Sequence, residues 1–288
     1  MKRVGHARRV VVCLIMVLSF GLSVSTAYGK DKLIFGVHPF KSAKELNKMF
    51  TPLIKYLEKE TGVKIQFRSS RSYDAAIQAI LDGDVDISYL GPAGYAILSD
   101  EHPTKVRPIA VVVNKGKPTF KGVIVTKDDS RLTSLKQLKG KKVAFGDRKS
   151  TLSCYMPAYM IMKAGVFDSI SYNFLGTHDN VAKAVQAGYF DAGGLKPGVA
   201  NKYIGKGLKV LAVSQEVHEH VIVAGYKLNP VIYKKIRKAM LNVKDPKVYK
   251  SIKKSLTGFA SVKSRDYNNL RKVIKAVDAK IPTGYASK

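Results

Sequence analysis

Cysteine is scarce in this sequence, which has two such residues among 288. Cys13 falls within an apolar run near the N-terminus, and Cys154 stands alone in the rest of the chain. An exported protein that keeps a single thiol forms no internal disulfide. Cys154 is followed by Tyr155 and Met156, a setting that is typical of a buried core residue rather than a reactive one.

Long apolar runs are equally scarce. The first 29 residues join a basic segment, an apolar run of about fifteen residues and the small residues STAYG, which is the pattern of a secretory signal. We expect Ala27 and Gly29 to fill the cleavage positions, so that the mature chain starts near Lys30 in the periplasm. An uncleaved anchor is the alternative, although the run is short for a span. The remaining 259 residues hold no second spanning segment and suffice for two compact domains.

Acidic residues are few. Beyond residue 29 the chain has 46 Lys and Arg against 21 Asp and Glu, a net charge of +25, and residues 227–288 hold seventeen of the basic and three of the acidic residues. Such a balance is typical of proteins that bind nucleic acid. The lysines, however, lie in segments such as YKKIRKAMLNV, whose apolar spacing indicates amphipathic helices with solvated faces. We therefore expect attraction to anionic solutes or an anionic membrane surface, and no nucleic-acid partner.

Enzyme signatures are absent from the sequence. It has no HExxH, GxSxG or CxxC motif, no paired carboxylates at helical spacing, and neither Walker-A spacing nor the GxGxxG pattern of dinucleotide folds. His218 and His220 alternate as on one face of a strand, but no third metal ligand is identified. The sequence predicts a protein that is not an enzyme and that uses no metal or cofactor.

Alternating strand and helix patterns, in contrast, are plentiful. The first unit runs strand, helix, strand, helix, strand over residues 32–40, 42–62, 63–70, 72–84 and 85–92. Short connections between such elements indicate a parallel sheet covered by helices. Residues 107–130 break the rhythm with two β-runs around a polar turn, and the alternation then restarts.

The second unit repeats features of the first. A helix and a strand are expected over residues 132–147, and the segment AKAVQAGYFDAGGLKP (182–197) echoes IQAILDGDVDISYLGP (77–92). Both segments combine a helix, a glycine turn, a strand bearing Asp and a break at proline. A last strand over 218–228 and further helices return the chain to the first unit. This order predicts an α/β protein with two lobes and a cleft between them.

The segment FGDRKSTLSCYMP (145–157) sets hydroxyl residues where a strand ends and a helix begins. A helix start leaves backbone N–H groups unpaired and carries a partial positive charge. Ser150, Thr151 and Ser153 beside such a start suit the binding of an oxyanion. Simple capping of the helix by one hydroxyl is the alternative.

A second strand end carries GTHDN (176–180), in which His178 could donate to an oxyanion and Asp179 could cap the helix or orient His178. Ligands of open α/β sheets bind at the carboxyl ends of the strands. Tyr73 and Tyr89 occupy comparable strand ends in the first unit. Partial core packing is the alternative role for both tyrosines.

Four segments together carry a resemblance to a known family. They are FTPLIKYLEKETGVKIQF, YDAAIQAILDGDVDISYLGPAGYAIL, SLKQLKGKKVAFGDRKSTLSCYMPAYMI and GTHDNVAKAVQAGYFDAGGLK. The chain resembles the periplasmic substrate-binding proteins of phosphate, phosphite and phosphonate ABC transporters. The resemblance implies a type II periplasmic-binding fold with two crossover strands. We expect one lobe to comprise residues 30–118 and 218–288, and the other residues 119–217.

The resemblance also implies which residues bind the ligand. The family's Ser-Thr-Ser helix start corresponds to Ser150, Thr151 and Leu152, so that one hydroxyl is lost while the backbone N–H of Leu152 remains. The family's loop histidine matches His178, and one of its tyrosines matches Tyr73. The position of a second family tyrosine is occupied by Leu90 in this chain. The neighbouring residue, Tyr89, points to the opposite face of the strand. The expected ligand-binding residues are Tyr73, Tyr89, Ser150, Thr151, Leu152, Ser153, His178 and Asp179.

The ligand implied by the resemblance is a small oxyanion. Gly198 and His220 stand where family members that bind aminoalkyl phosphonates have acids for the ammonium group, which disfavours such ligands. We expect a monomer that delivers phosphate, phosphite or a phosphonate to an inner-membrane permease. The alternatives are a sensor for a membrane kinase, a receptor for a non-phosphorus ligand, an enzyme using His178 and Asp179, and a surface-binding basic protein.

Overall fold

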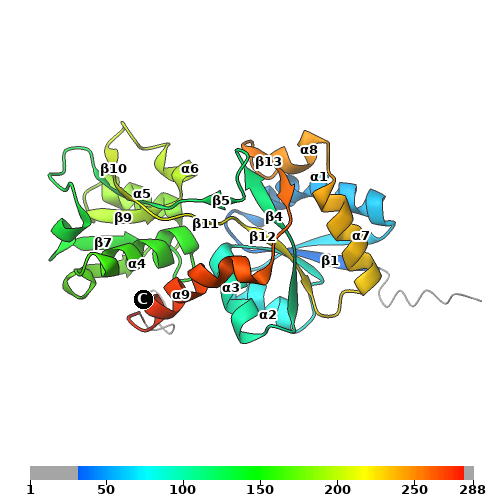
Figure 1. Cartoon of the computed structure of the whole chain (residues 1–288). Helices are drawn as coiled ribbons and strands as arrows, with labels where there is room; N and C mark the ends of the chain where they lie inside the picture. The colour runs from blue at the N-terminus through cyan, green and yellow to red at the C-terminus, as the bar shows by residue number, and fades with distance from the viewer. Residues whose placement is uncertain (1–31, 282–288) are drawn as a thin grey trace, which may run out of the picture.

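The computed structural model describes residues 32–281, which form two α/β lobes side by side (Figure 1). The predicted signal segment lies outside the described residues. Each lobe is built on its own sheet, and a short two-stranded ribbon runs between the sheets. Within the described chain no helix combines the length and the apolar character that crossing a membrane requires.

The sheet of the first lobe has six strands in the order β13-β4-β12-β3-β1-β2. These strands are β1 (Lys32–Val37), β2 (Lys64–Ser69), β3 (Ile87–Leu90), β4 (Val106–Asn114), β12 (Val221–Gly225) and β13 (Leu256–Ala260). The β2-β1-β3 part is parallel, and β12, β4 and β13 are antiparallel to their neighbours. The helices of this lobe are α1 (Ala43–Thr61), α2 (Tyr73–Leu81), α3 (Pro92–Glu101), α7 (Pro230–Leu241) and α8 (Pro246–Lys250).

The sheet of the second lobe has five strands in the order β10-β6-β9-β7-β8. These strands are β6 (Val123–Lys127), β7 (Lys142–Phe145), β8 (Ser171–Phe174), β9 (Ala192–Leu195) and β10 (Leu208–Val213). Strands β8-β7-β9 are parallel, and β6 is antiparallel to β9. The helices of this lobe are α4 (Met156–Lys163), α5 (His178–Gln186) and α6 (Pro197–Ala200).

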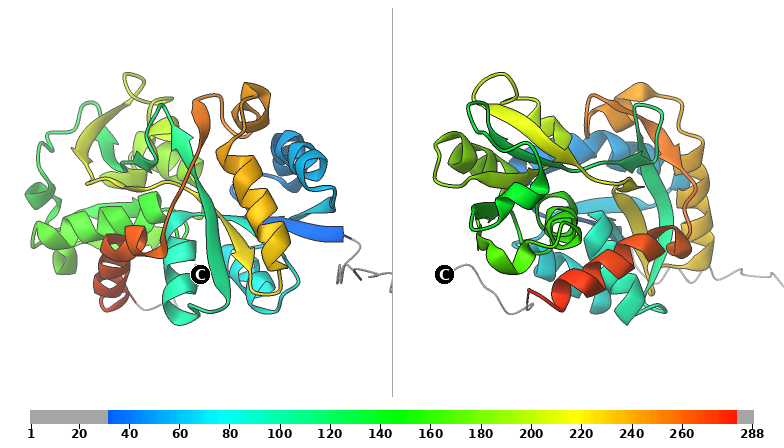
Figure 2. Two further views of the ribbon diagram at one scale, coloured as in Figure 1. Left: turned by 45° about the vertical axis from the view of Figure 1, so that its right-hand side comes forward. Right: turned by 60° about the vertical axis from the view of Figure 1, so that its left-hand side comes forward.

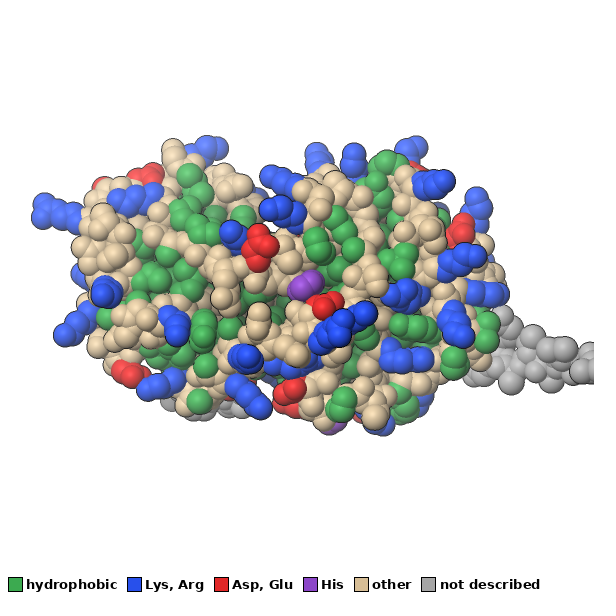
Figure 3. Space-filling model, in the orientation of Figure 1, with side chains coloured by type: hydrophobic (Ala, Val, Ile, Leu, Met, Phe, Trp, Pro, Cys, Tyr) green, Lys and Arg blue, Asp and Glu red, His purple; other side chains and the backbone are tan. Residues whose placement is uncertain are grey.

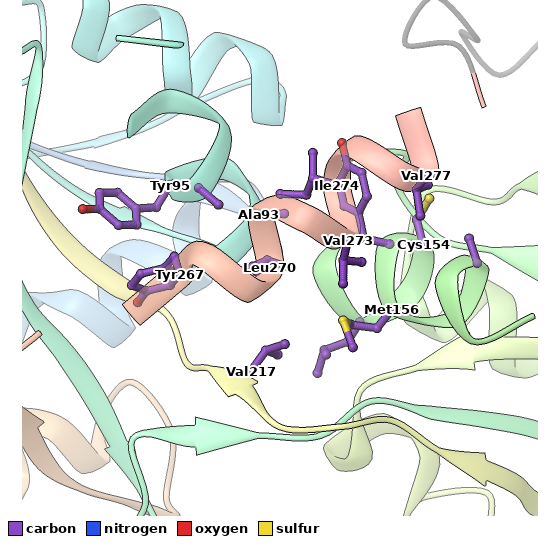
Figure 4. Packing of buried hydrophobic residues seen from close by; sticks show 14 of the residues in the cluster. Ala93, Tyr95, Cys154, Met156, Val217, Tyr267, Leu270, Val273, Ile274 and Val277 are labelled. Atoms are coloured by element: carbon purple, nitrogen blue, oxygen red, sulfur yellow. The ribbon is translucent and has the colours of Figure 1, made fainter. Parts of the chain in front are cut away.

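Three segments connect the lobes. Strands β5 (Thr119–Phe120) and β11 (Val217–His218) pair as an antiparallel ribbon between the two sheets. Helix α9 (Asn268–Asp278) runs beneath the lobe boundary and contacts both lobes (Figures 1 and 2). Its apolar side packs against α3 and α4, in one hydrophobic cluster that includes Ala93 and Tyr95 from the first lobe and Cys154 and Met156 from the second (Figure 4).

Helix α1 shows how the sequence pattern produces the fold. Leu46, Phe50, Leu53 and Leu57 recur at helical spacing and are fully buried against the first sheet. Ser42 and Glu45 form a capping box at its start, and Gly62 ends it in the left-handed conformation at φ 76°. This helix agrees with the prediction over residues 42–62.

Two predicted helices differ from the expectation. The segment at 132–141 forms a single 3₁₀ turn, Leu135–Leu138, because Gly140 at φ 73° turns the chain directly into β7. The helix that follows β7 opens with a π-turn, Thr151–Tyr155, in which the Tyr155 N–H donates to the carbonyl of Ser150 over 3.1 Å. This wider turn runs directly into α4.

On the face seen in Figure 3, basic side chains are distributed over both lobes. Helix α7 carries Lys234, Lys235 and Lys238 on exposed positions while Ile232 and Ile236 are buried. The amphipathic pattern therefore accounts for the lysines of this helix, as the sequence predicted.

Candidate functional site

The helix start after β7 leaves two backbone donors without an acceptor. Ser150 caps it, since its hydroxyl accepts from the Ser153 N–H over 3.2 Å, and its own N–H donates to Asp147. Among the described residues, no acceptor takes the N–H groups of Thr151 and Leu152. Two free donors at the positive end of a helix favour an anion.

The helix start after β8 lies beside the first one. Strands β7 and β8 are parallel and in register, so Phe145 and Phe174 end them side by side. The loops beyond them touch, because a β-carbon on Gly146 would lie 3.5 Å from the carbonyl oxygen of Gly176. Thr177 caps α5 by accepting from the Asn180 N–H over 3.1 Å. Within the described chain the N–H groups of residues 178 and 179 also lack an acceptor.

The imidazole of His178 is held in one tautomer. Its Nδ1 accepts from the backbone N–H of Lys196 over 3.2 Å, so the proton of the neutral ring is on Nε2. Burial, with the positive charge of Lys196 and the nearby His220, lowers the pKa of His178 to about 3. At neutral pH this ring is therefore an uncharged donor through Nε2.

Thr151 connects the two lobes. Its hydroxyl accepts from the N–H of Ala93, at the start of α3, over 2.9 Å. Close by, Lys149 of the second lobe pairs with Asp74 of α2. Thr151 is only 6% exposed, so the lobes meet closely here. The hydroxyl proton of Thr151 remains available to a ligand, because this bond uses only its oxygen.

Three of the expected site residues have their side chains engaged within the second lobe. Leu152 is buried beside Gly122, so it offers only its backbone N–H to the lobe boundary. The hydroxyl of Ser153 is fully buried and donates to the carbonyl of Gly194. Asp179 is exposed and pairs with Lys202 over 3.4 Å, while Thr177 caps the helix and Lys196 orients His178.

The first lobe presents aromatic rings to this boundary. Tyr73, the first residue of α2, lies 4.8 Å from the ring of His38, measured between centroids. Tyr89 stacks on His38 at 5.7 Å and on His220 at 5.0 Å, while Leu90 faces the opposite cluster. Burial, followed by the charge of Asp147, raises the pKa of Tyr73, which therefore stays a neutral hydroxyl.

His38 was not singled out from the sequence, although it follows β1 in the segment GVHPF. It is 1% exposed, and its Nδ1 donates to the carbonyl of Tyr89 over 3.0 Å. Burial, then the proximity of His220, lowers its pKa to about 3 against a weaker opposing effect of that hydrogen bond. Its place at the end of a parallel strand is the signal that would have identified it.

His220 lies where the chain returns from the ribbon to β12. Its Nδ1 donates to Glu219 over 2.8 Å, and Glu219 is 3% exposed. Burial acts to raise the pKa of Glu219, but the hydrogen bond and charge of His220, with Lys253, hold it below its usual value. His218 contacts Tyr267 instead, because β11 ends there and the strand alternation stops. In residues 32–281 no cluster of three or more His, Cys, Asp or Glu side chains is arranged to hold a metal.

Comparison with known proteins identifies the family. A family model described as ABC transporter, phosphonate, periplasmic substrate-binding protein matches residues 35–267. The chain belongs to this phosphonate-binding family. It is thus the substrate-binding component of a phosphonate, phosphite or phosphate ABC transporter, a periplasmic class of protein that is not catalytic.

Individual members of the family are distant in sequence. The chain is 28% identical over 233 residues to the phosphate-import protein PhnD of Mycolicibacterium smegmatis, covering 74% of this chain and 72% of the relative. It is 29% identical over 191 residues to a probable phosphite-binding protein, PhnD1, of Prochlorococcus marinus, covering 62% and 63%.

Solved structures confirm the fold. The structure of Prochlorococcus marinus PhnD1 in complex with methylphosphonate superposes with a TM-score of 0.75 at 24% identity, covering 86% of this chain and 98% of that one. The aliphatic sulphonate binding protein SsuA of Escherichia coli superposes with a TM-score of 0.60 at 16% identity, covering 88% and 94%. The predicted type II periplasmic-binding fold is therefore correct.

Proposed function

We propose that this chain captures phosphate, phosphite or a small phosphonate between its lobes and delivers it to an inner-membrane permease. The observation that carries the proposal is the pair of adjacent helix starts at Thr151 and His178, whose N–H groups have no acceptor in the described chain. Such donors hold an oxyanion without any bond chemistry. The relatives from Mycolicibacterium smegmatis and Prochlorococcus marinus are named for phosphate and phosphite, which supports this ligand class.

Each site residue has a role in this proposal. The N–H groups of Thr151 and Leu152, the hydroxyls of Ser150 and Thr151, and the Nε2–H of His178 donate to the phosphorus oxygens. The tyrosine hydroxyl of Tyr73 donates from the first lobe, and the ring of Tyr89 supports His38 and His220 behind it. Ser153 and Asp179 act indirectly, since their side chains are bonded within the second lobe.

Capture proceeds by closure of the lobes. Of the described residues, 32–118 and 218–267 move as one lobe and 119–217 move as the other, with α9 attached to both and the β5-β11 ribbon as the hinge. The ligand binds to the second lobe first, because the free donors are there. Closure then forms the bond between Ala93 and Thr151 and excludes water, which strengthens every hydrogen bond to the anion. The permease would recognise the closed form.

Calorimetric titration of the mature protein, stripped of ligand by partial unfolding, tests the proposal. Phosphate, phosphite, methylphosphonate and 2-aminoethylphosphonate are titrated in turn, and we expect at least one to bind with micromolar affinity or better. Replacing Thr151 by valine or His178 by alanine removes a hydrogen bond to a charged ligand. Each change should weaken binding by about tenfold to hundredfold, because such bonds contribute about 1.5–3 kcal/mol.

Ser42→Ala is the matched control. Ser42 also places a hydroxyl at a helix start, but this hydroxyl completes the capping box of α1. The change should cost about 1 kcal/mol of stability and leave the affinity unaltered. Binding that survives in both Thr151→Val and His178→Ala, or four ligands that all fail to bind, would contradict the proposed site.

A further inference from the structure

Lys196 occupies a distinctive place in the second lobe. It follows the last residue of β9 and precedes Pro197, the first residue of α6. Its backbone N–H fixes the tautomer of His178, so it borders the helix starts described above. In the internal echo of the sequence, the corresponding residue of the first lobe is Gly91, between β3 and Pro92. One lobe therefore has a long cation where the other has no side chain.

The ammonium group of Lys196 reaches across the lobe boundary. Its Nζ lies 5.8 Å from the ring centroid of Phe40, in the loop that follows β1 of the first lobe. Phe40 packs in turn on His38 and His220, at centroid distances of 5.0 Å and 6.4 Å. The positive charge thus faces the same space as the imidazoles and the helix starts.

No carboxylate in residues 32–281 forms an ion pair with Lys196. Asp179 is the acid whose charge acts on Lys196, and its carboxylate already forms an ion pair with Lys202. Burial lowers the pKa of Lys196, Asp179 opposes this effect, and Lys253, Lys202 and Lys41 add to it. A half-buried ammonium without an ion-pair partner of its own is costly unless an anion accompanies it.

We propose that Lys196 is a specificity residue whose ammonium pairs with the bound anion, so that the site selects ligands without a cationic substituent. This inference rests on the proposed function, since it names the charge class of the same ligand. Its geometry is that of an anion held between the helix starts on one side and the Lys196 ammonium on the other. A ligand bearing its own ammonium group would meet the charge of Lys196, which has no carboxylate partner in residues 32–281, whereas Lys41 and Lys253 pair with Glu45 and Glu219.

Two ligands with the same phosphonate head and different tails test the inference. Methylphosphonate has an uncharged tail, and 2-aminoethylphosphonate has a cationic one. We expect the unmodified protein to bind methylphosphonate at least about tenfold more tightly, because placing like charges together at a binding site is costly. Lys196→Met keeps the length of the side chain and removes its charge, so it should weaken methylphosphonate by about tenfold or more and bring the two affinities within about threefold of each other.

Two further variants complete the test. Lys202→Met removes a neighbouring charge that is paired with Asp179 on the surface and should change both affinities by less than about threefold. Lys196→Arg keeps the charge and should keep the preference for methylphosphonate. A preference that persists unchanged in Lys196→Met, or a preference of the unmodified protein for 2-aminoethylphosphonate, would overturn the inference while leaving the receptor function intact. If the unmodified protein bound none of the four ligands, methylphosphonate, 2-aminoethylphosphonate, phosphate and phosphite, both this inference and the proposed receptor function would be overturned.

Discussion

The two lobes are built on the same strand order, β2-β1-β3-β12 in the first and β8-β7-β9-β6 in the second, yet they present different chemistry to each other. The first lobe contributes rings: His38, Phe40, Tyr73 and Tyr89. The second contributes backbone N–H groups, hydroxyls, the Nε2–H of His178 and the ammonium of Lys196. Topology places side chains at the boundary, but the loop residues decide whether that boundary can bind an anion.

The caps of the first helices illustrate the difference. In the first lobe Ser42 and Glu45 satisfy each other's backbone at the start of α1, and the Glu45 carboxylate puts a negative charge there that repels an anion. In the second lobe Ser150 caps its helix alone, and the π-turn that follows leaves the N–H groups of Thr151 and Leu152 free. A capping box and an anion site are therefore alternative uses of the same helix start.

The echoed strands differ in the same way. Ser88 and Tyr89 of β3 correspond to Gly193 and Gly194 of β9. A β-carbon at Gly194 would lie 2.9 Å from the Cβ of Pro157 and 3.0 Å from the carbonyl oxygen of Ser153. The missing side chain lets the helix start approach β9, whereas Tyr89 fills the corresponding position with a ring.

Gly194→Ala should therefore produce the largest effect of the changes considered. The added methyl group pushes Pro157 and the turn at residues 150–155 away from β9, at a cost of about 1–3 kcal/mol in stability. Because the same turn holds the Thr151 donors, ligand affinity should fall by about tenfold or more. Urea denaturation and calorimetric titration measure the two quantities.

Gly198→Ala is the control for this change. Gly198 is exposed in α6, and no atom lies within 4 Å of the position that its β-carbon would take. We expect its stability to stay within about 0.5 kcal/mol of the original protein and its affinity to be unchanged. Equal effects of the two substitutions would show that the close approach at Gly194 is not what distinguishes the lobes.

Each lobe also contains one histidine whose pKa is strongly lowered, and the pH dependence of stability reports on both. The pKa of His38 and that of His178 are both about 3 in the folded protein, against about 6.5 in the unfolded chain. Between these values the unfolded state binds protons that the folded state does not, so stability is lost as the pH falls from 6.5 towards 3. For the ligand-free protein we expect a loss of about 1–2 kcal/mol for each histidine between pH 6.5 and 5, because over this range the loss depends on the pKa of the unfolded chain.

Denaturation at several pH values checks this expectation. His38→Gln keeps a donor for the carbonyl of Tyr89 and should flatten the pH dependence, and His178→Gln should flatten it by a similar amount. His102→Gln, at the exposed end of α3, should leave the curve as it was. A His38→Gln curve that runs parallel to that of the original protein would contradict the assignment of a buried neutral imidazole.

Much of this arrangement could be predicted from the sequence. The strand and helix alternation, which depends on local periodicity, and the echo and family resemblance, which depend on short sequence segments, led to the correct fold. His38, Phe40 and Lys196 were missed, because a single ring or lysine in a loop has no periodicity. The hydrogen bond from the Ser153 hydroxyl to the carbonyl of Gly194 could not be predicted from the sequence either, because it depends on how closely the helix approaches Gly194.

Helix α9 forms a strap that joins the two lobes, and weakening its attachment to the second lobe should have the smallest predicted effect on stability. Arg148, 9% exposed, bonds to Asp278 and to the carbonyl of Ile281, and so ties the end of α9 to the second lobe. Asp278→Asn should cost about 1 kcal/mol, because Arg148 loses a charged partner but keeps the carbonyl. Lys280→Met breaks only the exposed pair with Asp168 and should cost less than about 0.5 kcal/mol.

Thermal denaturation with and without ligand measures both changes. If the strap joins the lobes, Asp278→Asn should reduce the stability of the ligand-free protein more than that of the complex, where the ligand already holds the lobes together. An identical loss in both states would indicate that Arg148 and Asp278 stabilise the second lobe alone.

Because helix α9 is attached to both lobes, lobe movement should also change the heat capacity of the protein. Its start is fixed to the first lobe, where Tyr267 packs on Tyr95 and Arg271 bonds to Ser99, and its end is fixed to the second. The lobes can separate only if α9 leaves one of them, which brings part of the apolar cluster in Figure 4 into water. Exposure of apolar surface raises the heat capacity. Closure around a ligand of a few atoms therefore carries a negative heat-capacity change larger than the ligand's own surface can supply, and the excess comes from the protein.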